Sequence, residues 1–173
     1  AKWDGTYDSP GATNTAYRLV DRATGDTIAD LPDLIAPLFL RDGSVIGAMV
    51  TNDGVRVAHL DEGSGQIVAD GPILDALPDY ISADPGKEAG LGSFVDGSSA
   101  TLRTIDLDTL QFDNGFTVDG WSTSAISRTG DRIAAGTDRG IEVYDASGTE
   151  VGSIPGVLSL GVHITPADQL FVA

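Results

Sequence analysis

The sequence predicts an all-β fold built from repeated sheets of four antiparallel strands, and three observations lead to this prediction. Short alternating strands recur along the chain, separated by turns among which the 22 glycines are evenly spread. Aspartate supplies 22 of the 26 acidic residues, and aspartate favours turns where glutamate favours helices. One strand–turn–strand phrase also occurs four times at a nearly constant interval.

The first repeated phrase is an alternating strand that ends in an apolar residue and an aspartate, followed by a small polar turn. The aspartates that open the turns are Asp21, Asp61, Asp106 and Asp145, so the intervals are 40, 45 and 39 residues. A period of this size, with short strands and no helical pattern, is typical of the blades of a β-propeller. The copies are AYRLVDRATGDTI (16–28), RVAHLDEGSGQIV (56–68), RTIDLDTLQF (103–112) and IEVYDASGTEV (141–151).

The second repeated phrase is a strand, a tight turn and a strand of small or apolar residues. Its turn glycines are 43 and 44 residues apart, in step with the aspartates of the first phrase. The two phrases together describe four strands per unit, which is the composition of one propeller blade. The copies occupy 38–49, 81–92 and 125–136, with turn glycines Gly43, Gly86 and Gly130, and a copy with a shorter turn occupies 163–173.

Each blade is expected to contain a short apolar first strand, a second strand with small residues, an alternating third strand and a brief fourth strand. First strands are expected at Pro37–Leu40, Tyr80–Ala83, Ser124–Ser127 and Val162–Thr165, and fourth strands at Thr27–Ala29, Gln66–Ala69, Gln111–Phe112 and Glu150–Gly152. Blades are expected at 34–70, 79–113 and 123–153, with partial blades at 15–30 and 160–173.

The aspartate that opens each turn is expected to build that turn. Its carboxylate can accept hydrogen bonds from backbone amides two residues further on. A glycine that follows threonine or serine then supplies the positive φ that the reversal needs. These glycines are Gly25, Gly65 and Gly148. All four aspartates are therefore explained without a ligand.

Two stretches, NDGVRVAHLD (52–61) and TDRGIEVYD (137–145), resemble the WD-repeat β-propeller family, whose repeats end in Trp-Asp. The resemblance extends over nearly the whole chain in four degenerate copies. It implies a propeller, and such propellers are commonly appended to larger bacterial signalling or transcription-regulating proteins. The family's Gly-His pair is absent, and the tryptophan position is occupied by Val20, Leu60, Ile105 and Tyr144.

The expected strands begin with the third strand of one blade and end with the second strand of another, which amounts to about four blades. Three arrangements fit this pattern. The chain can be part of a seven- or eight-bladed propeller, two copies can close an eight-bladed ring as a homodimer, or one chain can close a four-bladed ring. The chain starts at Ala1 without a methionine, which fits a processed or trimmed piece.

Composition excludes several classes of site and partner. The chain has no cysteine, so disulfides, thiolate metal sites and cysteine nucleophiles are excluded. Its net charge of −16 repels phosphate backbones, so direct nucleic-acid binding by this segment is not expected. The longest apolar run, 34–40, contains a proline and is too short to span a bilayer. No membrane association is expected, and a cytoplasmic location is favoured although the absence of cysteine fits any compartment.

No catalytic set of residues stands out in the sequence. The only histidines, His59 and His163, are 104 residues apart and lie at non-equivalent places in the repeat. His59 is expected to be structural, whereas His163 begins an innermost strand and is a candidate to face the central channel. Trp121 is a candidate interface residue if it lies exposed at a rim.

The connections from a fourth strand to the next first strand carry a further candidate site. Leu-Pro-Asp occurs in two of them, and Asp119 lies in phase in a third. In a propeller these connections lie at one mouth of the channel, so Asp33, Asp79 and Asp119 could form an acidic ring. Such a ring would bind a divalent cation or a basic peptide, although Pro-Asp is also an ordinary turn pair. No other cofactor is expected.

Two functions are compatible with these residues. The first is a non-catalytic protein-interaction or sensing module, as a fragment of a larger signalling or transcription-regulating protein with a protein or peptide partner. The alternative is a metal-dependent enzyme of the lactonase or hydrolase type, with the metal held by the acidic ring. The two functions differ in whether the three carboxylates converge on an ion.

Overall fold

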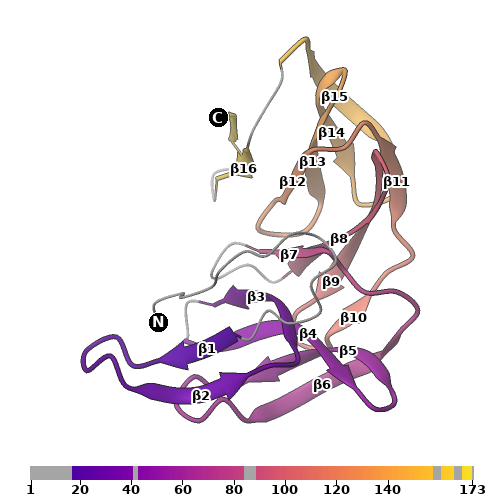
Figure 1. The fold of residues 1–173 in the computed structure, drawn as a ribbon. Coiled ribbons are helices and arrows are strands. Elements are labelled where there is room, and N and C mark those ends of the chain that lie inside the picture. The colour runs from indigo at the N-terminus through magenta and orange to yellow at the C-terminus, as the bar shows by residue number, and fades with distance from the viewer. Residues whose placement is uncertain (1–16, 41–42, 84–88, 158–160, 166–168, 173) are drawn as a thin grey trace. The chain divides into compact units, whose positions relative to one another are not determined.

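The structure, a computed structural model, is all-β in every part that it describes, as the sequence predicts (Figure 1). The chain divides into two compact units, Ala1–Leu77 and Pro78–Ala173, and each unit contains its own sheets. The residues described are 17–40, 43–83, 89–157, 161–165 and 169–172.

The first unit contains one hairpin and one four-stranded antiparallel sheet. The sheet has the order β3-β4-β5-β6, so strands that are adjacent in sequence are adjacent in the sheet. Leu19 and Leu31 of the hairpin are buried together with Leu34, Val45 and Leu60 of the sheet, which joins the two. The strands are β1 (Tyr17–Val20), β2 (Thr27–Leu31), β3 (Leu34–Phe39), β4 (Val45–Thr51), β5 (Gly54–Leu60) and β6 (Ile67–Leu74).

The second unit contains two full sheets and another hairpin. The first sheet has the order β7-β8-β9-β10, with β11 also paired to β9, and the second has the order β12-β13-β14-β15. Four antiparallel strands in sequence order are the composition of a propeller blade. The strands are β7 (Tyr80–Ser82), β8 (Ala89–Asp96), β9 (Ser99–Asp106), β10 (Gln111–Phe112), β11 (Phe116–Asp119), β12 (Thr123–Ile126), β13 (Arg132–Thr137), β14 (Gly140–Asp145), β15 (Glu150–Pro155), β16 (Val162–Ile164) and β17 (Leu170–Val172).

The three full sheets share one register between their second and third strands. In each sheet, a residue near the start of the second strand lies opposite the residue that immediately precedes the turn-opening aspartate. The repeat in the sequence therefore specifies strand pairing as well as turn position. The pairs are Val45 with Leu60, Gly90 with Ile105, and Ile133 with Tyr144.

Three of the turn-opening aspartates, Asp21, Asp106 and Asp145, accept the backbone hydrogen bonds expected of them, whereas the carboxylate of Asp61 accepts a bond from the Ser64 hydroxyl at 2.7 Å. Asp21 Oδ1 accepts bonds from the amides of Ala23 and Thr24, at 2.7 and 2.9 Å. Asp145 Oδ1 accepts bonds from the hydroxyl and the amide of Ser147, at 2.6 and 2.9 Å. These bonds hold the pKa of both carboxyls below its ordinary value, chiefly through the Thr24 amide at Asp21 and the Ser147 hydroxyl at Asp145.

One turn uses leucine where the other turns use glycine. The Leu110 amide donates to the Asp106 carbonyl at 2.8 Å, just as the Gly65 amide donates to the Asp61 carbonyl at 2.7 Å. Leu110 has a φ of 57°, in the left-handed region that costs a residue with a Cβ about 1–2 kcal/mol. Its side chain is 2% exposed, so burial of the leucine offsets the backbone strain.

The outermost strands differ from the brief fourth strands expected from the sequence. β6 and β15 contain eight and six residues. In the sheet that begins with β7, the fourth strand is split, because β10 pairs with one end of β9 and β11 with the other. Asp113 lies at the break and accepts bonds from the amide and hydroxyl of Thr104, at 3.0 and 2.7 Å. Asp119 consequently lies at the end of a strand.

The two full sheets of the second unit pack face to face through an apolar cluster. Leu102 of the first sheet is buried with Ile133 and Tyr144 of the second. One hydrogen bond also crosses this interface, between the hydroxyls of Ser93 and Ser124 at 3.0 Å. The opposite face of the second sheet packs on the hairpin β16–β17. The central sheet of this unit is therefore covered on both faces.

A buried glutamate on β14 is the main polar feature of this core. Glu142 is 4% exposed, and its two carboxylate oxygens contact the Tyr144 hydroxyl at 2.5 Å and the Arg139 guanidinium at 2.7 Å. Burial, and then the bond to Glu142, raises the pKa of the Tyr144 phenol. Tyr144 immediately precedes the turn-opening Asp145, so a hydroxyl–carboxylate pair lies at this position of the repeat.

Replacing Tyr144 with phenylalanine is expected to lower the free energy of unfolding by about 1–3 kcal/mol, because the buried carboxylate of Glu142 loses a donor. The raised pKa of the Tyr144 phenol also makes the free energy of unfolding depend on pH. Its contribution is complete below the ordinary tyrosine pKa of 10.0 and is lost as the pH rises above that value. Urea unfolding at neutral pH and above about pH 10 measures both effects.

The variant should lose less stability than the wild type between these two pH values. Tyr80→Phe is the matched control, because it removes a hydroxyl from a ring that is half exposed. Equal losses in the two variants would contradict a specific role for the Tyr144–Glu142 bond.

The turn aspartates Asp106 and Asp145 are expected to make stability fall in acid. Their pKa is depressed in the folded state, so their contribution is complete above the ordinary value of 3.8 and is lost as the pH falls towards the folded pKa. The double variant Asp106→Asn/Asp145→Asn keeps an acceptor oxygen in each turn but cannot titrate. Its urea midpoint should therefore depend less on pH below about 5 than that of the wild type. An unchanged acid slope would count against this account, and Asp108→Asn controls for the loss of a charge.

Candidate protein-interaction surface

The turn between β8 and β9 connects several polar and aromatic residues of the second unit. The carboxylate of Asp79 accepts a bond from the Val95 amide at 2.7 Å, at the end of β8. The carboxylate of Asp119 accepts a bond from the Ser99 hydroxyl at 2.8 Å, at the start of β9. The Trp121 amide donates to the carbonyl of Ser98, within the turn, at 2.9 Å. Three residues singled out from the sequence, Asp79, Asp119 and Trp121, are thus anchored around one turn.

An aromatic pair lies beside these carboxylates. The rings of Tyr80 and Trp121 have centroids 5.7 Å apart and planes tilted by 40°. The Tyr80 side chain is 48% exposed, whereas Trp121 is half-buried and packs against the core cluster of the unit. Within the described residues, the buried Nε1 of Trp121 has no hydrogen-bond partner. Trp121 therefore supports the exposed Tyr80 through ring packing and not through a hydrogen bond of its indole nitrogen.

Two more carboxylates lie at the same end of the sheets. Asp96 flanks the β8–β9 turn and is exposed, and Asp138 lies in the turn between β13 and β14. Asp138 is close to the strand end that carries Asp119, since a Cβ on Gly120 would lie 2.5 Å from its Cγ. We call Asp79, Asp96, Asp119 and Asp138, with the pair Tyr80–Trp121, the β8–β9 loop surface.

The charge of the β8–β9 loop surface is not neutralised by nearby cations. Within the described ranges, none of its four carboxylates forms an ion pair. The adjacent cation, Arg139, is committed to the buried Glu142. The surface therefore presents an exposed tyrosine among aspartates, an arrangement that attracts cationic groups through charge and through the face of the ring.

The other residues singled out from the sequence lie elsewhere. Asp33 is exposed in the turn between β2 and β3 of the first unit, where its carbonyl accepts a bond from the Val50 amide at 3.0 Å. His163 is exposed on β16, opposite Phe171, and His59 is half-buried on β5, opposite Ile46. His59 thus packs as a strand residue, as expected. Of the turn glycines, Gly86 lies outside the described residues.

The described part of the chain does not contain a preformed set of metal ligands. No group of three or more histidine, aspartate or glutamate residues there is arranged to hold a metal ion. Asp79 and Asp119 instead each hold a backbone or hydroxyl donor of the β8–β9 hairpin. The acidic ring of Asp33, Asp79 and Asp119 remains a prediction.

Tyr80, Asp96 and Asp138 were not singled out from the sequence. A usable signal was present, because the turn between second and third strands lies at the same end of an antiparallel sheet as the connection from fourth to first strand. The turns VDGSS and TDRG each carry an aspartate at that end. Counting strand parity would therefore have placed Asp96 and Asp138 with Asp79 and Asp119.

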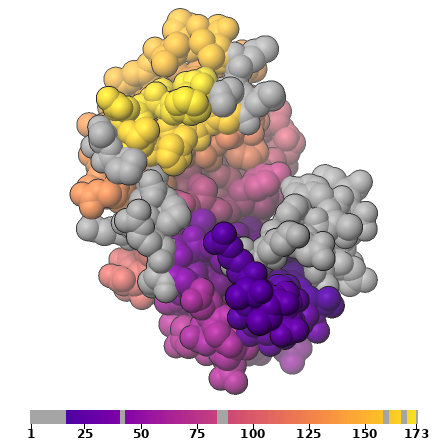
Figure 2. Space-filling view, turned by 90° about the vertical axis from the view of Figure 1, so that its left-hand side faces the viewer, coloured from indigo at the N-terminus to yellow at the C-terminus, as the bar shows by residue number. Residues whose placement is uncertain are grey.

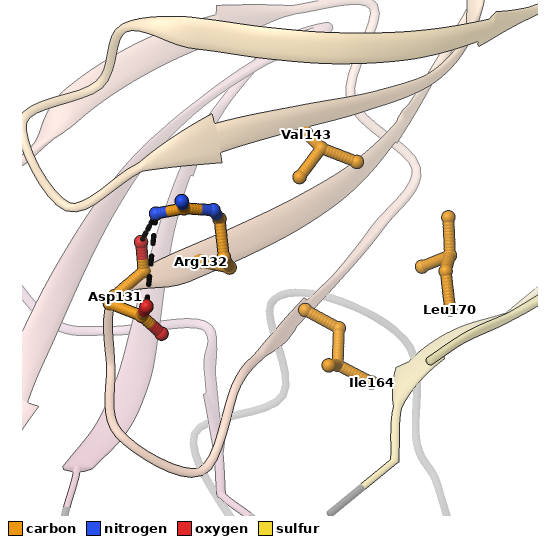
Figure 3. Close-up of a pocket in the computed structure, with 5 residues that line it drawn as sticks. All are labelled: Asp131, Arg132, Val143, Ile164 and Leu170. Atoms are coloured by element: carbon orange, nitrogen blue, oxygen red, sulfur yellow. Dashed lines mark hydrogen bonds and ion pairs between the residues drawn. The ribbon is translucent and has the colours of Figure 1, made fainter. Parts of the chain in front are cut away.

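The second unit also contains a cavity of about 370 Å³ away from the β8–β9 loop surface. Its lining comes from the turn before β13, from β14 and from both strands of the hairpin β16–β17 (Figure 3). Arg132 lies over this cavity and is held by Asp131, whose carbonyl accepts a bond from its guanidinium at 2.7 Å. The apolar lining residues are Val143, Ile164 and Leu170.

Known structures with a similar fold are β-propellers. The chain superimposes on the Cps50 (Swd1) β-propeller domain of Myceliophteria thermophila with a TM-score of 0.58 and 13% identity, over 89% of this chain and 61% of that one. It superimposes on hydrazine synthase of Kuenenia stuttgartiensis with a TM-score of 0.61 and 19% identity, over 85% of this chain and 45% of that one. These likenesses show the fold, and the chain spans less than two thirds of either protein.

Sequence comparisons do not assign this chain to a family. No protein-family model matches the chain, and no curated protein matches it. The fold is therefore that of β-propeller blades, while membership of the WD-repeat family is not shown. The described residues include no helix that is long and apolar enough to cross a membrane.

Trp121 is expected to tolerate phenylalanine but not alanine. Trp121→Phe removes an indole N–H that has no partner among the described residues, so it should change the free energy of unfolding by about 1 kcal/mol or less. Trp121→Ala removes the support beneath Tyr80 and should cost about 2–4 kcal/mol. Urea unfolding followed by circular dichroism distinguishes the two. If phenylalanine is as costly as alanine, the indole nitrogen makes a bond that this account omits.

Proposed function

We propose that this chain is a non-catalytic protein-interaction module, and that its β8–β9 loop surface contacts a partner segment carrying lysine or arginine side chains. The observation that supports this proposal most strongly is the half-exposed Tyr80, which is supported by Trp121 and lies among four aspartates that form no ion pair with any described residue. Aromatic side chains held rigidly at a surface are common anchors of protein interfaces.

The chemistry of the surface favours a basic partner segment. A lysine or arginine side chain can lie over the face of Tyr80 while its charged group approaches Asp79 or Asp119. The net charge of −16 would increase the rate at which a cationic partner is captured, and added salt would weaken that attraction. The same charge opposes direct contact with nucleic acid.

The architecture supports the proposal of an interaction module. The loop residues are joined to a rigid set of sheets by backbone and hydroxyl bonds, which holds the surface in one geometry before binding. We propose further that the module belongs to a larger signalling or transcription-regulating protein, as the resemblance of the sequence to WD-repeat propellers implies. The hydrolase alternative has less support, because the described residues include no group of three or more histidine, aspartate or glutamate residues that could hold a metal ion.

Binding to a short basic peptide tests this proposal. The probe is a fluorescein-labelled peptide with alternating lysine and arginine in a glycine background, and the readout is fluorescence anisotropy at low and at physiological salt. Asp96→Asn/Asp138→Asn should weaken binding by about 3- to 10-fold, because each lost charge contributes up to about 1 kcal/mol at an exposed site. Both residues have exposed side chains, so the fold should be retained.

Asp26→Asn/Asp108→Asn is the matched control, because it removes the same charge from exposed positions in turns at the other ends of strands. The control should bind as the wild type does, whereas Tyr80→Ala should weaken binding. Equal weakening in the two double variants would show attraction by net charge alone and would overturn the proposed surface. An absence of binding at low salt would overturn the basic partner.

A further inference from the structure

The break between β10 and β11 leaves two residues, 114 and 115, between two anchored neighbours. Asp113 is anchored because its carboxylate accepts bonds from the amide and the hydroxyl of Thr104, and its own amide donates to the Thr104 carbonyl at 3.0 Å. Phe116, the first residue of β11, is anchored by pairing with β9 and by its ring, whose centroid lies 4.9 Å from that of Tyr144. Residues 114 and 115 connect these two points.

Asn114 and Gly115, the connecting residues, are exposed and belong to no strand. Among the described residues, neither the side chain of Asn114 nor the amide of Gly115 makes a hydrogen bond. Figure 2 shows salmon atoms from the chain near β10 on the outside of the molecule. The side-chain amide of Asn114 and the backbone nitrogen that follows it are therefore not held in place by the rest of the described structure.

The sheet requires glycine at position 115. Gly115 has a φ of 67°, in the left-handed region, and a Cβ there would lie 2.3 Å from the carbonyl oxygen of Leu102. Glycine also has the least hindered backbone nitrogen, because it has no side chain beside that nitrogen. The need for glycine at this point of the sheet thus places an accessible nitrogen directly after Asn114.

These two residues have the groups for an intramolecular reaction. When the Gly115 nitrogen loses its proton to a base, it can attack Cγ of Asn114 and close a five-membered succinimide ring. The bond from the nitrogen to Cγ forms, the bond from Cγ to Nδ2 breaks, and Nδ2 takes a proton from solvent and leaves as ammonia. Water then opens the ring at either carbonyl. One opening gives aspartate, and the other gives isoaspartate, in which the main chain runs through Cγ.

We propose that Asn114 is a site of spontaneous deamidation in the folded protein, and that isoaspartate forms there. The isoaspartyl product adds one atom to the main chain and one negative charge between Asp113 and Phe116. Both of these neighbours are fixed to the same sheet, so the longer connection is expected to weaken the pairing of β11 with β9.

Incubation of the folded chain in mildly alkaline buffer, followed by peptide mapping with mass spectrometry, tests this proposal. Asn52 is the internal control, because it is also exposed in a turn but precedes Asp53. The side chain of Asp53 hinders its nitrogen, and its charge opposes loss of the amide proton. The peptide that contains Asn114 should therefore gain the mass of an acid several-fold faster than the peptide that contains Asn52, and isoaspartyl methyltransferase should label it.

Two variants separate the reaction from its consequences. Asn114→Gln keeps a neutral amide but needs a larger ring to react, so it should abolish the labelling and keep its urea midpoint through the incubation. The incubated wild type should unfold at a lower urea concentration than the fresh protein. Asn114→Asp carries the added charge on a main chain of normal length, so it should unfold close to the fresh wild type.

Each other outcome would overturn the proposal. Equal rates at Asn114 and Asn52, or a reaction that occurs only in urea, would show that the folded chain does not favour this site. Aspartate without isoaspartate would overturn the product, and an unchanged urea midpoint after complete conversion would overturn its effect on β11. None of these measurements involves the β8–β9 loop surface, so the result is independent of the proposed function.

Discussion

The sheets of the second unit depend on one another because their inner strands are apolar on both faces. On β13, the consecutive residues Ile133 and Ala134 are both fully buried, one in the cluster shared with the preceding sheet and the other in the cluster shared with the following hairpin. A sheet of this kind cannot bury its surface alone, so its stability comes from face-to-face packing. A blade without both neighbours would leave a large apolar face in water.

Because the faces of the inner strands are buried, most charged side chains lie at the ends of the strands. Carboxylates lie in the turns, and those of Asp21, Asp106 and Asp145 accept hydrogen bonds from backbone amides of their own turn. Glu142 differs from them, because it is buried in a sheet interface and needs both Tyr144 and Arg139 to satisfy its oxygens. The end of the sheets around β8–β9 remains as a place where carboxylates are exposed without cationic partners.

The β8–β9 loop surface shows how separate stretches of sequence are brought together at one end of a sheet. Asp79 and Trp121 precede and follow the sheet that begins with β7, and both are tied to its central hairpin through Val95 and Ser98. The hairpin therefore acts as a common anchor. Because the anchor is itself part of a packed sheet, the positions of Tyr80 and its neighbouring carboxylates are set before any partner arrives, which lowers the ordering cost of binding.

The sequence by itself determined the all-β class, the order of strands and the turns, because these depend on local alternation, on glycine and aspartate, and on a period close to 40 residues. It also singled out candidates: Asp33, Asp79 and Asp119 from equivalent connections at one end of the blades, and Trp121 as a large aromatic residue. Only the tertiary structure decided which turns meet, how β10 and β11 share β9, and that Glu142 is buried. These features arise from contacts between residues that are distant along the chain, and a local pattern carries no information about which distant side chain will fill a given space.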